Sequence, residues 1–216
     1  MPKAEQDFRM GWDNDIPIFL GIVDSQKWEE LPWKKIEKKV HKLQTRIYRA
    51  SSRGDTQAVR RLQKTLLKSW SAKCLAVRKI TQDNTGKKTA GVDGIKSLSP
   101  DDRLELVNQI KLGNKVKPTR RIWIPKSDGY QRPLGIPTIH DRTLQTLAKM
   151  TLEPEWEALF EANSYGFRPG RGCHDAIEAI FNHLKSKTKF VLDADISKCF
   201  DKIDHKALLE KINFQS

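Results

Sequence analysis

Two carboxylates near the end of an apolar run are the residues best suited to do chemistry. The run Phe190-Val191-Leu192-Asp193-Ala194-Asp195-Ile196 predicts a β-strand of mixed burial. Because side chains alternate along a strand, Asp193 and Asp195 share one face. A carboxylate at a strand end suits Mg²⁺, which takes hard oxygen ligands and keeps water and phosphate oxygens in its other positions. The simpler interpretation is a pair of exposed acids where a strand ends.

The charge of the chain points to a polyanionic partner. In 216 residues, 40 Lys and Arg face 27 Asp and Glu, which gives a formal net charge of +13. Each cation that meets a phosphate releases a condensed counterion, so this imbalance favours nucleic acid binding. The alternative is a basic protein whose charge only keeps it dispersed. The interleaving of cations with aromatic residues and helical faces favours nucleic acid.

Cysteine usage and hydropathy exclude secreted and membrane classes. Cys74, Cys173 and Cys199 are widely separated and form no C-x-x-C pair, which argues against a disulfide framework and against a zinc knuckle. The first residues hold no apolar core of signal-peptide length, and no stretch is long enough to span a bilayer. The prediction is a cytoplasmic protein with no membrane partner.

Two basic amphipathic helices are predicted between residues 33 and 78. The first has an apolar stripe at steps of three and four, formed by Trp33, Ile36, Val40, Leu43 and Ile47. Residues 51–55 break it, and Asp55 is placed to cap a second helix. The apolar side of the second helix comprises Val59, Leu62, Leu66, Trp70 and Val77. Cations on the remaining surfaces are RNA-binding candidates, although each face could be only a solvated exterior: Lys34, Lys38, Lys42, Arg46, Arg60, Arg61 and Lys64.

The middle of the chain predicts a loop, a helix and a β-hairpin. A Gly-rich loop over 81–100 leads to a helix that Ser99 caps and Gly113 ends. Strands at 120–125 and 131–137 flank a turn and form the hairpin.

Three further helices are predicted towards the end of the chain. One starts at His140 and carries Pro154 near its end. The next runs over 173–185, with Ile177, Ile180, Phe181 and Leu184 as its core face. Asp204 is placed to cap the last.

The segment from Asp193 to His205, DADISKCFDKIDH, closely resembles the first catalytic motif of group II intron-encoded reverse transcriptases. The resemblance implies that Asp195 is the first metal-binding aspartate, with Mg²⁺ as the cofactor. It also implies that Phe200 is the steric gate that rejects a 2′-hydroxyl on the incoming deoxynucleoside triphosphate. Ile196 is assigned to the same nucleotide site.

Upstream motifs resemble the same family in the expected order. Residues 124–138 are similar to its fingers hairpin, so Lys126 and Arg132 are expected to hold the triphosphate. Residues 164–172 resemble the loop that contacts template and primer, and residues 89–94 the extension that covers the template strand. In the 164–172 loop the candidates for stacking and phosphate contacts are Tyr165, Phe167, Arg168 and Arg171. Both aromatics could instead pin the loop to the core.

The resemblance implies an α+β fold, with right-hand polymerase fingers, a helical N-terminal extension and an incomplete palm. The expected divisions are a leader (1–27), a basic helical hairpin (28–80), fingers (81–188) and the start of the palm (189–216). The expected partners are group II intron RNA, an RNA template with a DNA primer, a deoxynucleoside triphosphate and a second chain that completes the palm.

Polymerase chemistry needs carboxylates from more than one strand, and the family's downstream Asp-Asp pair does not occur here. The chain alone is therefore expected to be inactive. Two other functions stay open: an inactive RNA-binding remnant of such an enzyme, and a generic basic DNA-binding protein.

Overall fold

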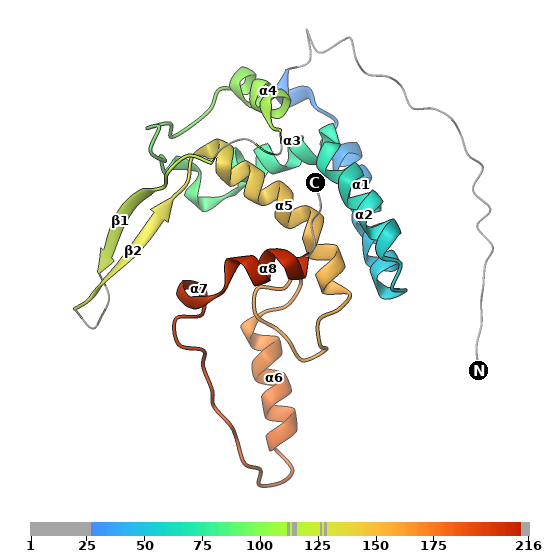
Figure 1. Ribbon diagram of the computed structural model, residues 1–216, viewed down its shortest axis with the longest axis vertical. Coiled ribbons are helices and arrows are strands. Elements are labelled where there is room, and N and C mark those ends of the chain that lie inside the picture. Colours follow the sequence, from blue (N-terminus) through green and yellow to red (C-terminus); the bar gives the residue numbers. More distant parts are fainter. Residues whose placement is uncertain (1–26, 112, 114–115, 126, 128, 213–216) are drawn as a thin grey trace, which may run out of the picture. The chain divides into compact units, whose positions relative to one another are not determined.

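The computed structural model describes residues 27–111, 113, 116–125, 127 and 129–212. It divides into an N-terminal unit, residues 1–160, and a C-terminal unit, residues 161–216. Helices predominate, and the described strands form one small two-stranded sheet (Figure 1). This mixture confirms the α+β class in its coarse form. The leader predicted for residues 1–27 lies almost wholly outside the described residues.

The basic helical hairpin forms, but its second arm is broken in two. Helix α1 spans Trp33–Ser52, α2 Thr56–Lys68 and α3 Trp70–Arg78. The Asp55 side chain caps α2 as predicted, accepting a hydrogen bond from the Ala58 N–H at 2.9 Å. The prediction of one continuous second helix was wrong. Ser69 is extended, with φ −65° and ψ 121°, so α3 restarts in a new direction and Trp70 is exposed instead of buried.

The core of the N-terminal unit lies where α1, α2, α3 and α5 (Ile139–Glu157) pack together (Figure 1). The predicted stripe of α1 faces this core, and α3 contributes small side chains that let the helices approach closely. Its fully buried members include Ile47, Leu66, Ala72, Cys74, Val77 and Leu147. The apolar periodicity therefore predicted the packing faces of α1 and α2 correctly.

Helix α5 contains Pro154 in its last turn, as predicted. A proline has no N–H, so the carbonyl four residues earlier, that of Met150, has no helical donor. The Gln44 side chain of α1 donates to this carbonyl at 2.9 Å, and Ser51 donates to the Glu155 carbonyl at 3.0 Å. Side chains of α1 thus satisfy backbone groups at the interrupted part of α5, which makes the proline tolerable there.

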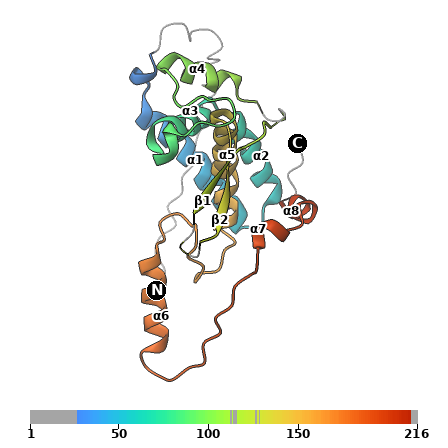
Figure 2. The same cartoon turned by 90° about the vertical axis from the view of Figure 1, so that its left-hand side faces the viewer.

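The N-terminal unit also contains three short helical turns and a further helix, α4, which contacts α3. The turns are η1 (Trp28–Glu30), η2 (Lys79–Asp83) and η3 (Thr85–Lys88), and α4 spans Pro100–Gln109 (Figures 1 and 2). Ser99 and Asp102 form a reciprocal capping box, and these hydrogen bonds lower the pKa of Asp102. The predicted cap is confirmed. The predicted end at Gly113 was too late, because Ile110 is already extended and buries its side chain.

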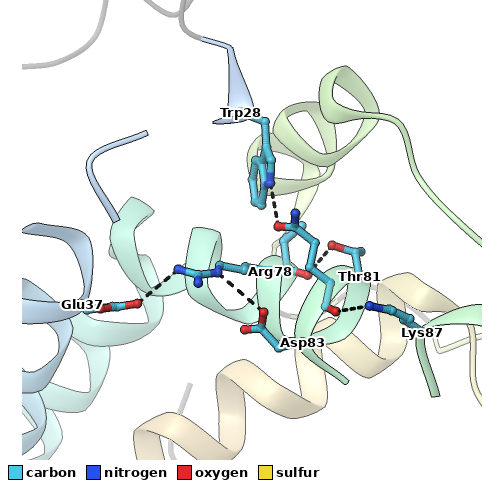
Figure 3. A network of polar contacts seen from close by, with 8 residues as sticks. Trp28, Glu37, Arg78, Thr81, Asp83 and Lys87 are labelled. Atoms are coloured by element: carbon cyan, nitrogen blue, oxygen red, sulfur yellow. Dashed lines mark hydrogen bonds and ion pairs between the residues drawn. The ribbon is translucent and has the colours of Figure 1, made fainter. Parts of the chain in front are cut away.

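A polar network joins η1, α1, α3 and η2. Arg78 contacts the carboxylates of Glu37 at 3.1 Å and Asp83 at 3.7 Å (Figure 3). In the same view, the buried Trp28 donates its indole N–H to the Gln82 side chain at 2.8 Å. These contacts tie η1 to η2, and the end of α3 to both α1 and η2.

The predicted β-hairpin is present. Strands β1 (Arg120–Pro125) and β2 (Gln131–Ile136) pair antiparallel, with Arg120 opposite Ile136 and Pro125 opposite Gln131. The hairpin extends away from the helices of its unit as a two-stranded arm (Figure 1). Most of its side chains are exposed, and Ile136 at its base is buried.

The C-terminal unit consists of α6 (Cys173–Leu184), α7 (Cys199–Lys202), α8 (His205–Ile212) and their connections. Asp204 caps α8 as predicted, accepting from the Ala207 N–H at 3.1 Å. The strand predicted at 190–196 was wrong: the segment has no regular secondary structure, and its side chains are exposed. A strand needs a partner for its backbone groups, and no described segment pairs with this one. The predicted core face of α6 is also exposed.

Candidate nucleotide and RNA-binding sites

Of the two cations predicted to hold the triphosphate, Arg132 lies on the β-hairpin and Lys126 lies outside the described residues. Arg132 is in β2, opposite Ile124, and its side chain is exposed. The antiparallel register fixes the backbone of Arg132, so the guanidinium projects from a defined position on an exposed arm. That placement leaves it accessible to an anion.

Asp195 and Phe200 both lie in the C-terminal unit, on either side of a sharp local bend. One Asp195 carboxylate oxygen accepts the backbone N–H of Ile196 at 2.8 Å. Lys198 adopts a left-handed conformation, with φ 53°, and α7 starts directly after it. Phe200, within α7, is 87% exposed. Arg132 belongs to the other unit, so a pocket shared by all these residues stays a prediction.

The described residues fit only part of a magnesium site. Asp195 offers hard carboxylate oxygens on an exposed segment, which suits one ligand position of such an ion. Across the part of the chain that the structure describes, no three His, Cys, Asp or Glu side chains gather closely enough to hold a metal. A complete site needs further ligands beside Asp195.

Both arginines of the 164–172 loop donate hydrogen bonds to nearby backbone carbonyls. Arg168 is buried, and its guanidinium donates to the carbonyls of Glu161 and Ser164, each at 2.7 Å. Arg171 donates to the Ala162 carbonyl at 2.8 Å and lies over the Tyr165 ring at 5.7 Å. These contacts order the loop. Because Arg168 is buried, it is not placed to meet phosphates as predicted, whereas Arg171 stays partly exposed.

Phe167 is fully exposed and left-handed, with φ 59°. It therefore does not pin the loop to a core. An exposed aromatic ring on an ordered loop is a suitable surface for stacking.

Basic side chains cover the outer face of α1. The predicted RNA-binding residues Lys34, Lys38, Lys42 and Arg46 are all exposed. A shallow surface hollow on this helix is lined by Lys35, Lys38, Lys39 and Lys42. Lys35 and Lys39 were missing from the predicted set, although their spacing of three and four from the others was a usable signal. On α2, Arg61 and Lys64 are exposed and Arg60 is half-buried.

The loop that precedes α4 is held by residues that the sequence did not single out. Arg142 of α5 donates to the carbonyls of Gly86 at 3.1 Å and Thr89 at 2.8 Å. Burial lowers the pKa of Arg142, and the charge of Asp93 counteracts this. Gly91 packs so closely on the backbone of Thr138 that a Cβ there would lie 2.8 Å from the Thr138 Cα. Long-range contacts of this kind leave no periodic signal in the sequence.

Two family models match successive parts of the chain. The model described as the N-terminal domain of reverse transcriptase matches residues 28–110. The model described as reverse transcriptase (RNA-dependent DNA polymerase) matches residues 124–216. The chain belongs to the reverse transcriptase family. The resemblance to group II intron-encoded members, drawn from the motifs, is confirmed together with it.

Relatives with curated names agree with this membership. Protein YkfC of Escherichia coli is 37% identical over 144 residues, which cover 62% of this chain and 38% of the relative. Group II intron-encoded protein LtrA of Lactococcus lactis is 37% identical over 136 residues, 61% of this chain and 22% of the relative. Maturase-like protein 1 of Euglena gracilis is 29% identical over 202 residues, 90% of this chain and 44% of the relative. The chain thus spans less than half the length of each.

The two matched regions place the candidate residues within the family. The first covers α1 to α4, with the basic faces and the loop that Arg142 holds. The second begins at the end of β1, includes β2 with Arg132, and continues through Asp195 and Phe200. None of the described helices is both long enough and apolar enough to cross a membrane.

Proposed function

We propose that this chain is the N-terminal part of a group II intron-encoded reverse transcriptase and maturase. In the complete protein this part helps to copy intron RNA into DNA and to bind the intron RNA during splicing. The observation that carries the proposal is the succession of two reverse transcriptase models along one chain, with the Asp195–Phe200 motif inside the second.

In this proposal the nucleotide site combines the β-hairpin with the segment around Asp195. Lys126 and Arg132 hold the triphosphate of the deoxynucleotide through charge-assisted hydrogen bonds. Asp195 supplies a ligand for Mg²⁺, which when bound neutralises charge on the phosphates. Phe200 lies against the sugar and rejects a 2′-hydroxyl, and Ile196 lines the same site. The exposure of Arg132, Asp195 and Phe200 supports this assignment.

The 216-residue chain alone is expected to be catalytically inactive, because its sequence has no Asp-Asp pair downstream of Asp195. Template-dependent primer extension by the purified chain measures this directly, and any extension above background would contradict the expectation. Addition of a second chain that supplies the Asp-Asp motif is expected to give extension, and Asp195→Asn to abolish it. Extension that is indifferent to Asp195 would favour the inactive-remnant alternative.

The basic faces of α1 and α2 are the proposed RNA-binding surface, together with Tyr165, Phe167 and Arg171. Loss of three phosphate contacts in a Lys34, Lys38 and Lys42→Gln variant is expected to weaken binding of structured intron RNA and to flatten its salt dependence. A matched control removes the same charge elsewhere, at Lys149, Lys206 and Lys211. Equal loss in both variants would show that only net charge matters.

A competition experiment with RNA and duplex DNA distinguishes the proposed function from that of a generic DNA-binding protein. A generic DNA-binding protein has no preference for RNA, whereas the proposed maturase segment prefers structured intron RNA to duplex DNA of the same length. Equal competition by both nucleic acids would contradict the proposal. An RNA template with a DNA primer, a second chain that completes the palm and a cytoplasmic location stay predictions.

A further inference from the structure

The N-terminal end of α5 contacts two segments that are distant from each other in sequence. One is the loop over residues 86–95, which begins within η3, and the other is the base of the β1–β2 hairpin. All three belong to the N-terminal unit. The loop resembles the family's template cover, and the hairpin carries the cations assigned to the triphosphate, so their mutual placement matters for the proposed function.

Arg142 holds the loop from one side. Its two terminal guanidinium nitrogens donate to the carbonyls of Gly86 at 3.1 Å and Thr89 at 2.8 Å. A guanidinium can span two carbonyls with fixed geometry, which an ammonium group cannot do. Its ε nitrogen is buried without a partner among the described atoms. An unpaired buried donor costs free energy, so the two carbonyl bonds hold the side chain in place despite that cost.

Gly91 is a second point at which the loop packs against the start of α5. A Cβ on Gly91 would lie 2.9 Å from the Pro137 carbonyl oxygen and 2.9 Å from the Thr138 nitrogen. Real Cβ atoms do not approach backbone atoms so closely, so any larger residue must push the loop away from the start of α5. Gly91 is buried, in agreement with this close packing.

Asp141 holds the hairpin base. It is 3% exposed, and one of its carboxylate oxygens accepts from the Thr138 hydroxyl at 2.8 Å and the Lys117 N–H at 3.4 Å. Lys117 lies just before β1, and Thr138 lies just after β2. One buried carboxylate therefore connects the entrance and the exit of the hairpin.

We propose that the turn Thr138–Arg142 is a joint that fixes the 86–95 loop and the β1–β2 hairpin relative to each other, with Arg142 and Asp141 as its positioning residues. The role of this joint in the enzyme rests on the proposed function. There it sets the distance between residues 86–95, which resemble the family's template cover, and the β1–β2 hairpin, which carries the cations assigned to the triphosphate. The contacts themselves do not depend on it.

Hydrogen exchange of the 216-residue chain tests the joint without RNA or nucleotide. Arg142→Ala and Gly91→Ala are expected to raise exchange in residues 86–95 by at least about tenfold, with α1 and α3 changed by less than about twofold. Asp141→Asn is expected to raise exchange at Lys117 and along the hairpin instead. Lys149→Ala, an exposed cation on the same helix, is the matched control and leaves all of these segments unchanged.

Arg142→Lys is a second variant that keeps the positive charge, and it is included in case Arg142→Ala simply unfolds. It is expected to raise exchange in the loop in the same way as Arg142→Ala. The proposal is overturned if the loop exchanges as in the parent chain in both Arg142 variants. It is equally overturned if exchange rises by one factor throughout α1, α3 and the loop, since that pattern reports global opening alone.

The same variants separate this inference from the proposed function. If the exchange pattern is as expected but the unaltered chain does not bind structured intron RNA, the joint stands and the RNA-binding assignment falls. If structured intron RNA binds but the exchange pattern is absent, the RNA-binding assignment stands and the joint falls. Each result decides one proposal without reference to the other.

Discussion

Both units of this chain contain helices with an apolar face. Among the described residues, these faces are buried in the N-terminal unit and exposed in the C-terminal unit. In the N-terminal unit, the amphipathic faces of α1 and α2 pack against α3 and α5, and Ile47 and Leu66 are completely buried. In the C-terminal unit, α6 and α8 also have apolar faces, yet Arg168 is the one buried side chain among the residues described there. An amphipathic pattern predicts which face of a helix will be buried, but burial itself needs a partner surface.

The largest expected contrast comes from the same substitution in both units. Leu66→Ala in α2 removes a completely buried side chain and is expected to lower the free energy of unfolding by about 2–5 kcal/mol. Leu209→Ala in α8, where the side chain is 66% exposed, is expected to change it by less than about 0.5 kcal/mol. Urea unfolding measures both. An equal loss in the two variants would remove the distinction between the units.

A second experiment examines the interrupted part of α5. Gln44→Ala leaves the Met150 carbonyl without its side-chain donor, so we expect a loss of about 1–3 kcal/mol in unfolding free energy. Gln145→Ala, at an exposed position of α5, is the control. In a chain that also carries Pro154→Ala, residue 154 regains a backbone N–H that can donate to the Met150 carbonyl. The loss of unfolding free energy caused by Gln44→Ala should then be smaller. Additive losses in the double variant would show that the two residues are not coupled.

A buried thiol, Cys74 of α3, lies in the N-terminal unit. Burial raises the pKa of Cys74 from 9.0 to about 12, whereas Cys173 is exposed. The folded state therefore holds Cys74 protonated above pH 9, where the unfolded chain releases the proton. Stability from this thiol is complete below pH 9 and is lost as the pH rises towards 12, by about 1 kcal/mol from pH 9 to 10.

Two cysteine variants separate the contribution of Cys74 to the pH dependence of stability from the contributions of other titrating groups. Unfolding followed at pH 9 and pH 10 should show a smaller decrease in Cys74→Ala than in the parent chain. Cys173→Ala should show the same decrease as the parent. A decrease of equal size in all three proteins would mean that Cys74 does not contribute.

The smallest expected difference concerns surface ion pairs. Glu37→Gln breaks the 3.1 Å pair with Arg78 in the network of Figure 3, and we expect a loss of less than about 1 kcal/mol. Glu210→Gln in α8 weakens a 4.0 Å pair with Lys206 and should have no measurable effect. The difference between the variants should disappear at high salt, which screens exposed charges. A difference that persists in high salt would indicate that Glu37 contributes through packing.

Much of the local structure could be predicted because it depends on neighbouring residues. The stripe of α1, the caps Asp55, Ser99 and Asp204, and the β-hairpin all follow from side chains within a few positions of one another. Family membership followed in the same way, because the motif around Asp195 is contiguous. The roles assigned to Asp195, Phe200, Lys126 and Arg132 stay predictions, since a shared pocket depends on how separate segments are placed.

The sequence by itself thus determined where most helices form, which faces of α1 and α2 are buried, and the family, since periodicity, capping and contiguous motifs are local properties. Tertiary structure alone decided that Ser69 interrupts the second helix, that Gln44 serves the Met150 carbonyl and that Arg142 holds the 86–95 loop. It also left residues 190–196 without strand structure, because a strand forms only where another segment accepts its hydrogen bonds. Contacts between distant residues have no period and no fixed spacing along the chain, so only the folded arrangement can reveal them.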